Sequence, residues 1–166
     1  MDAKHTGKIY GINGPVIYLK GRTGFKMSEM VYVGKENLVG EVIGLKKGMT
    51  TVQVFEETTG LRPGETVTGT GDAISVLLGP GIIHNIFDGI QRPLEAIMAK
   101  SGSASITRGI EVPALDREKK WDFVATAKVG DKVATGDFLG QVQETPSILH
   151  KIMVPAGAEG TVESIT

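Results

Sequence analysis

Glycine-rich stretches are the parts of this sequence best suited to hold a phosphate group. Two candidates occur, Gly69-Thr70-Gly71 and Gly79-Pro80-Gly81. A phosphate-binding loop also needs Gly-Lys followed by Ser or Thr, because the lysine and the hydroxyl complete the phosphate and magnesium site. Neither Gly7-Lys8 nor Gly34-Lys35 is followed by Ser or Thr. We therefore interpret both glycine-rich stretches as simple turns and expect no cofactor-binding residue in this chain.

The other side chains with catalytic or metal-binding potential are scattered along the sequence. His5, His84 and His150 lack the spacing of a helical metal-binding motif, so structural or surface roles are expected. Glu56 and Glu57 are adjacent, and neighbouring residues of a strand point to opposite faces, so a solvated turn is the better interpretation. We expect no catalytic residue and no metal ligand.

The cysteine and tryptophan content further limits the kinds of chemistry and binding that the sequence allows. The sequence contains no cysteine, which excludes disulfides, thiolate catalysis and cysteine-ligated zinc. The single tryptophan, Trp121, has charged residues on both sides. It could be a binding platform, but a partly buried anchor, where a linker meets a domain, is the favoured interpretation.

One lysine has a setting typical of a covalently modified side chain. Lys151 lies in LHKIMVPAGAEGTV (149–162), after KVGDKVATGDFLGQV (128–142), and this rhythm looks like the small β-barrel that carries biotin or lipoyl groups. A carrier lysine must sit at an exposed hairpin tip, and the tip after Glu144-Thr145 is Pro146-Ser147. Lys151 also lacks the flanking methionines of the biotinyl pattern. We therefore expect it in the returning strand, as a solvated or partner-facing charge.

Composition indicates a soluble globular protein of 166 residues, with 40% hydrophobic and 22% charged residues. A net charge of -1 implies no general attraction to nucleic acid or acidic membranes. No apolar run reaches the ~18 residues of a membrane span, and the first residues lack an apolar signal core, so an intracellular protein is expected. The 23 glycines fall singly between β-branched runs, which predicts many turns joining short strands.

The first part of the chain predicts an antiparallel β-barrel. Its short runs rich in Val, Ile, Thr or Tyr are separated by turn signals, and closure would protect their edges. The expected strands are 7–12, 15–20, 30–34, 38–43, 50–56, 65–69 and 73–78.

The pattern changes after residue 78. Apolar residues recur at helical intervals over 82–90 and again over 94–98, with Pro93 suited to the first turn of the second helix. A linker over 101–115 then leads to a second β unit that begins at Phe123. Because a new strand has barely started at the last residues, we expect the chain to be part of a longer polypeptide.

These elements predict a mainly β fold. It comprises an N-terminal six- to seven-stranded antiparallel β-barrel, a short helical connector and a second small β-barrel-like unit, incomplete at the C-terminus. With no complete active site, the residues favour a binding or assembly role and do not name the partner.

Five stretches in series give a more specific indication. The sequence resembles, almost throughout and in the same order, the catalytic A subunit of the A-type/V-type rotary ATPases. The five stretches are GKIYGINGPVIYLKG (7–21), GEVIGLKKGMTTVQVFEETTGLRPGETVTGTG (40–71), SVLLGPGIIHNIFDGIQRPLEAI (75–97), VPALDREKKWDF (112–123) and ETPSILHKIMVPAGAEGTV (144–162).

The resemblance implies a domain organisation and a set of partners. Residues 1–78 would be the N-terminal barrel, which forms a crown with the B subunit of the same complex. Residues 79–110 would be a helical connector leading to the nucleotide-binding domain. Residues 111–166 would begin the β-rich insertion, or bulge, that meets peripheral-stalk subunits. Nucleic acid and direct membrane insertion are not expected.

The resemblance also implies an activity for the intact subunit. That subunit couples ATP synthesis or hydrolysis to ion translocation, with ATP or ADP and magnesium, as a peripheral part of a complex on the cytoplasmic side of the membrane. Its phosphate loop and catalytic carboxylate would lie beyond residue 166, so this chain alone is predicted to be inactive. Two alternatives stay open: a free-standing two-barrel interaction module and, with less support, a biotinyl- or lipoyl-type carrier domain.

Overall fold

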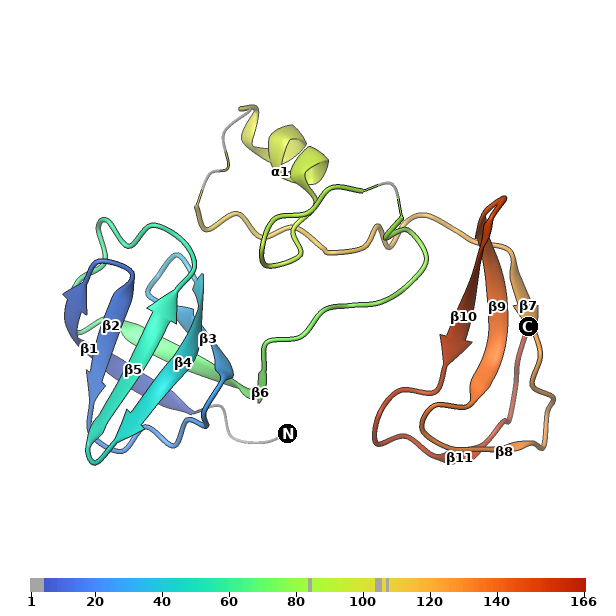
Figure 1. The fold of residues 1–166 in the computed structure, drawn as a ribbon, viewed down its shortest axis with the longest axis horizontal. Coiled ribbons are helices and arrows are strands. Elements are labelled where there is room, and N and C mark those ends of the chain that lie inside the picture. Colours follow the sequence, from blue (N-terminus) through green and yellow to red (C-terminus); the bar gives the residue numbers. More distant parts are fainter. Residues whose placement is uncertain (1–4, 84, 104–105, 107) are drawn as a thin grey trace. The chain divides into compact units, whose positions relative to one another are not determined.

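The computed structural model describes residues 5–83, 85–103, 106 and 108–166 (Figure 1). The chain divides into two compact units. The first comprises Met1–Val76 with Met98–Glu111, and the second comprises Leu77–Ile97 with Val112–Thr166. Among the residues described, no helix combines the length and the apolar character needed to cross a bilayer.

Six antiparallel strands close into a barrel in the order β1-β2-β5-β4-β3-β6 (Figure 1). β6 pairs with both β1 and β3 and so completes the closure. This confirms the predicted antiparallel barrel. The strands are β1 Thr6–Asn13, β2 Val16–Lys20, β3 Glu29–Val33, β4 Leu38–Lys46, β5 Met49–Val54 and β6 Thr66–Ala73.

The barrel core follows from the alternation of its strands. In β3, Val31 and Val33 are fully buried while Tyr32 between them is exposed, because successive side chains of a strand point to opposite faces. β-branched residues suit such a pleated, packed surface. The core cluster is Ile9, Ile17, Leu19, Phe25, Val31, Val33, Leu38, Val42, Val52, Val54 and Val67.

The predicted strand over 73–78 is wrong beyond its first residue. β6 ends at Ala73, because six strands already close the barrel and leave no edge for a seventh. The backbone of Leu77 instead meets a side-chain amide, donating to Gln91 Oε1 at 2.7 Å and accepting from Gln91 Nε2 at 2.6 Å.

The predicted helix over 82–90 is also wrong for the residues described. Asp88 accepts the backbone N–H groups of Ile90 and Arg92 and pairs with the Arg92 side chain at 2.7 Å. These bonds fix a turn, and Gln91 adopts a left-handed φ of 62°, so helical spacing is overridden. Burial raises the pKa of Asp88, but the hydrogen bonds and charge of Arg92 and the Ile90 N–H together bring it below its ordinary 3.8.

The second predicted helix is confirmed. α1 spans Leu94–Ser101 and begins directly after Pro93, whose carbonyl accepts the N–H of Ile97 at 3.0 Å. Pro93 needs no backbone donor at this position. Glu95 in the first turn and Lys100 in the last turn oppose the helix dipole favourably.

The second unit is built from short antiparallel strands. β9 Phe138–Thr145 lies between β10 Ile148–Met153 and β7 Phe123–Ala125, while β8 Lys132–Val133 pairs with β11 Gly160–Thr161. Gly140 leaves room for the Phe123 side chain, since a Cβ there would come within 2.3 Å of the Phe123 ring.

Candidate functional site

Lys151 lies in the returning strand, as the sequence predicts. It sits in β10 opposite Gln141, and the tip between β9 and β10 is the turn at Pro146-Ser147. Its side chain is exposed, and the ammonium lies 4.9 Å from the centre of the Phe138 ring, within the range of a cation–π contact. A lysine held in a ladder and over a ring is poorly placed to swing a cofactor between sites.

Gly69-Thr70-Gly71 is part of strand β6, so its interpretation as a turn is wrong. The N–H of Gly71 donates to Glu29 Oε1 at 2.9 Å, and the N–H of Gly69 donates to the His5 carbonyl at 2.8 Å. A Cβ on Gly69 would come within 2.2 Å of Glu29 Oε1. The glycine therefore makes room for a carboxylate that already occupies the place a phosphate would need.

Glu29 is the buried acid that closes this stretch. It is 1% exposed, and its second oxygen, Oε2, accepts the N–H of Lys26 at 2.7 Å. Each oxygen thus takes one backbone amide, which offsets part of the cost of burying a charge.

Gly79-Pro80-Gly81 is a turn, and an internal carboxylate closes it as well. Glu144 Oε1, at the end of β9, accepts the N–H groups of Gly81 at 2.7 Å and Ile83 at 3.1 Å. Gly81 has a φ of 103°, which glycine adopts without strain. The Glu144 side chain is only 3% exposed, so this amide nest is filled from within the chain.

Glu144 differs from Glu29 in its second oxygen. Oε2 lies 3.5 Å from His150 Nδ1, and it is buried without a hydrogen-bond partner among the residues described. His150 comes from β10, so the carboxylate links the loop to two strands of the same sheet.

The remaining candidates do not assemble a catalytic or metal centre. Within residues 5–83, 85–103, 106 and 108–166, no three His, Asp or Glu side chains are grouped so that they could hold a metal ion. His5 is exposed before β1, and His84 lies outside the described residues. Trp121 is half-buried, 3.6 Å from where a Cβ on Gly81 would stand, with the Lys119 ammonium 4.2 Å above its ring.

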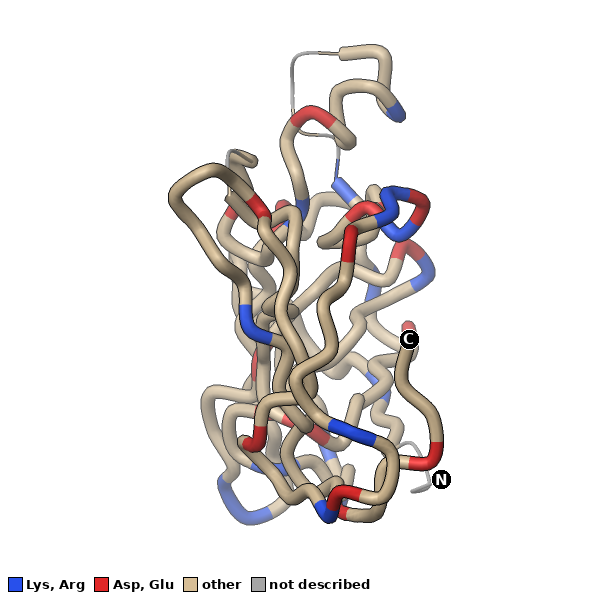
Figure 2. Tube along the Cα trace, turned by 90° about the vertical axis from the view of Figure 1, so that its right-hand side faces the viewer, with Lys and Arg blue, Asp and Glu red and all other residues tan. Residues whose placement is uncertain are grey.

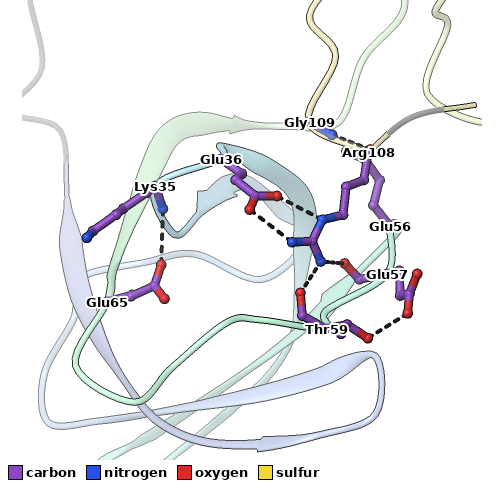
Figure 3. Close-up of polar contacts among 8 residues, drawn as sticks. All are labelled: Lys35, Glu36, Glu56, Glu57, Thr59, Glu65, Arg108 and Gly109. Atoms are coloured by element: carbon purple, nitrogen blue, oxygen red, sulfur yellow. Dashed lines mark hydrogen bonds and ion pairs between the residues drawn. The ribbon is translucent and has the colours of Figure 1, made fainter. Parts of the chain in front are cut away.

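Glu56 and Glu57 lie in a loop after β5, as expected for a solvated turn, but they have a partner that the sequence analysis missed. Arg108 donates from Nη1 to the carbonyl oxygens of Glu57 and Thr59, and its guanidinium pairs with Glu36 (Figure 3). Up to 72 residues separate these groups in sequence. The only local signal was an Arg-Gly pair in an otherwise small, polar stretch.

Lys and Arg residues and Asp and Glu residues are both spread over the chain (Figure 2). This agrees with the net charge of -1.

The fold comprises a closed antiparallel barrel and a second unit with one three-stranded and one two-stranded sheet, which is an arrangement of small β domains. Two family models match it: residues 9–71 match the ATP synthase alpha/beta family, beta-barrel domain, and residues 112–166 match the ATP synthase alpha/beta subunit barrel-sandwich domain.

Relatives extend the match to nearly the whole chain. The V-type ATP synthase alpha chain of Clostridium perfringens is 51% identical over 160 residues, which is 96% of this chain and 27% of the relative. The A subunit of the A-type ATP synthase of Methanococcus vannielii is 52% identical over 159 residues, with the same coverage. The corresponding A subunit of Pyrococcus horikoshii is 53% identical, and the chain covers 16% of it.

The chain belongs to the family of A/V-type ATP synthase alpha chains, also called A subunits. It spans about a quarter of the length of most of these relatives.

Proposed function

We propose that this chain is the barrel-bearing portion of a catalytic A subunit, and that it serves the assembly of the ATPase head. In the intact subunit, ATP synthesis or hydrolysis would be coupled to ion translocation, in a complex peripheral to the cytoplasmic side of the membrane. The observation that carries the proposal is the 51% identity over 96% of the chain. We further propose the division into barrel (1–78), connector (79–110) and insertion (111–166).

The proposal assigns nucleotide chemistry to other parts of the intact subunit. The amides of Gly71 and Gly81 already bind Glu29 and Glu144, and the sequence has no Gly-Lys followed by Ser or Thr. These residues do not fit ATP or ADP with magnesium. The chain alone should be inactive.

Calorimetry with ATP and magnesium tests this assignment. Titration of the 166-residue chain should give no saturable heat. Site-specific micromolar binding would contradict it, and the same titration with inorganic phosphate would show whether a bare anion accounts for any signal.

The proposed partners are the companion B subunit for the barrel and peripheral-stalk subunits for the second unit. Exposed apolar side chains support both assignments. The barrel presents Tyr10, Leu45 and Phe55, and the second unit presents Phe138, Leu149 and Met153, all more than 40% exposed. Exposed apolar side chains of this size are candidates for protein contacts.

Pull-down with matched triple variants separates the two roles. Changing the three barrel residues to Ser should reduce capture of the B subunit, while changing the three in the second unit should leave it intact. Stalk subunits should respond in the opposite way. No association of the unaltered chain with the B subunit, or equal loss in both variants, would count against the assignment.

A further inference from the structure

A short return segment is fastened to the barrel by a pair of residues, Arg108 and Gly109. Residues 108–111, here called the strap, follow α1 and belong to the barrel unit, whereas the residues from Val112 onward belong to the second unit. At its far end the strap is tied to α1, since Lys100 donates to the Glu111 carbonyl at 2.7 Å.

Arg108 makes the charged part of this contact (Figure 3). Nη2 donates to Glu36 Oε1 and Nε pairs with Glu36 Oε2, each at 2.9 Å, in the turn between β3 and β4. Nη1 faces the carbonyl oxygens of Glu57 and Thr59. A planar guanidinium fork fits this set of acceptors, and a lysine ammonium does not.

Gly109 makes the steric part of the contact between the strap and the barrel. Its N–H donates to Glu56 Oε2 at 2.9 Å. It has a φ of 68°, and a Cβ there would come within 3.1 Å of the Glu36 carbonyl oxygen. A larger residue would therefore push the strap away from the turn, so the barrel surface is fitted to arginine followed by glycine.

The strength of this contact differs from that of the barrel core. The side chains of Arg108 and Glu36 are 30% and 50% exposed, and exposed ion pairs are weak and are screened by salt. The contact therefore holds the strap while leaving it able to detach without unfolding the barrel.

We propose that the barrel carries a recognition site for an Arg-Gly pair, that the chain's own strap is its occupant, and that the strap opens and closes reversibly. Closure holds residues 108–111 against the barrel, and opening releases them. The inference goes beyond the proposed function and requires neither nucleotide nor any other chain of the complex.

Trypsin cleavage after Arg108 measures the opening directly. Cleavage of a transiently opened segment follows the population of the open form when closing is fast. The exposed Arg117 provides a reference site in the same molecule. In the full chain, Glu36→Gln should raise the Arg108 rate relative to Arg117 by about fivefold, the size expected for one partly exposed ion pair.

A salt series on the unaltered chain gives the same test without any substitution. Raising the salt concentration to about 1 M should increase the relative Arg108 rate by a similar factor, because screening weakens the pair. An unchanged ratio at high salt together with an unchanged ratio in Glu36→Gln would overturn the proposal.

Two glycines of matched conformation separate the contact from backbone strain. Gly102 has a φ of 67° and Gly109 one of 68°, but a Cβ on Gly102 meets nothing within 4 Å. Gly109→Ala should raise cleavage after Arg108 severalfold, whereas Gly102→Ala should leave it within twofold. Equal rates in the two variants would refute the fit to Arg-Gly, and far-UV circular dichroism checks that each barrel is folded.

Discussion

Each of the two units uses a buried glutamate to accept the backbone N–H groups of a glycine-rich stretch. The two glutamates differ in how many of their oxygens take part. In the barrel, Glu29 closes the stretch around Gly71 and gives one oxygen to each of two amides. In the second unit, Glu144 closes the turn around Gly81 and gives one oxygen to both amides. Its other oxygen lies 3.5 Å from His150 Nδ1 and has no hydrogen-bond partner within the described part of the chain.

This difference shows what a glycine-rich stretch can mean in a sequence. Clustered N–H groups attract an anion, but the anion can be a side chain of the same chain. In the barrel, both oxygens of Glu29 accept a hydrogen bond. In the second unit, Oε2 of Glu144 accepts none among the residues described. The two carboxylates should therefore respond differently to the same substitution.

The largest effect is expected from Glu29→Ala. It leaves the buried N–H groups of Lys26 and Gly71 without acceptors and should destabilise the barrel by about 3–5 kcal/mol, at 1–3 kcal/mol for each unsatisfied group and with a cavity added. All three tyrosines lie in the barrel, so their near-UV circular dichroism during urea unfolding reports on this unit. Asp72→Ala, an exposed neighbour of Gly71, should change the stability by less than about 0.5 kcal/mol. Equal effects of the two variants would show that Glu29 does not hold the strand.

Glu144→Ala should have a smaller effect, of about 2–3 kcal/mol on the second unit. Only one oxygen of this carboxylate accepts hydrogen bonds from the loop, although the N–H groups of Gly81 and Ile83 both lose their acceptor. Trp121 is the single tryptophan and packs beside Gly81, so its fluorescence follows the loop during denaturation. An unchanged transition would contradict the role given to Glu144.

Substitution by glutamine gives a finer comparison of Glu29 with Glu144. In Glu29→Gln the new NH₂ group must face an N–H donor, because both oxygens of the carboxylate accept one. In Glu144→Gln the NH₂ can take the place of Oε2, which accepts none among the residues described. We expect a loss of about 2 kcal/mol at Glu29 and less than about 1 kcal/mol at Glu144. A larger loss at Glu144 than at Glu29 would reverse the comparison.

A modest pH effect is expected from Asp88. Because its folded-state pKa lies below the ordinary 3.8, its contribution is present above that value and is lost as pH falls through the folded pKa. Asp88→Asn keeps an acceptor for the backbone but loses the ion pair with Arg92, at a cost of about 1 kcal/mol near neutral pH.

The measurement is the stability of the second unit from about pH 6 down to about pH 2, with Asp122→Asn in the same unit as the exposed control. The acid-dependent part should shrink in Asp88→Asn and persist in the control. Identical pH profiles for Asp88→Asn and the unaltered chain would contradict the assignment.

Local patterns in the sequence predicted the barrel and α1, and competing side-chain hydrogen bonds and long-range contacts explain what they missed. Alternating residues such as Val31 and Val33 carry the strand signal by themselves. The helix over 82–90 failed because Asp88 gives the backbone a competing set of hydrogen bonds. The most distant partners of Glu29, Glu144 and Arg108 lie 42, 63 and 72 residues away, beyond the reach of any periodicity.

The glycine amides themselves offer the most direct test that both glycine-rich stretches are closed by carboxylates of the same chain. In ¹⁵N-labelled chain, the N–H resonances of Gly71 and Gly81 can be followed while ATP and magnesium are added. The structure predicts that neither resonance shifts, because Glu29 and Glu144 already accept these protons. A saturable shift of either glycine at micromolar nucleotide would contradict the account.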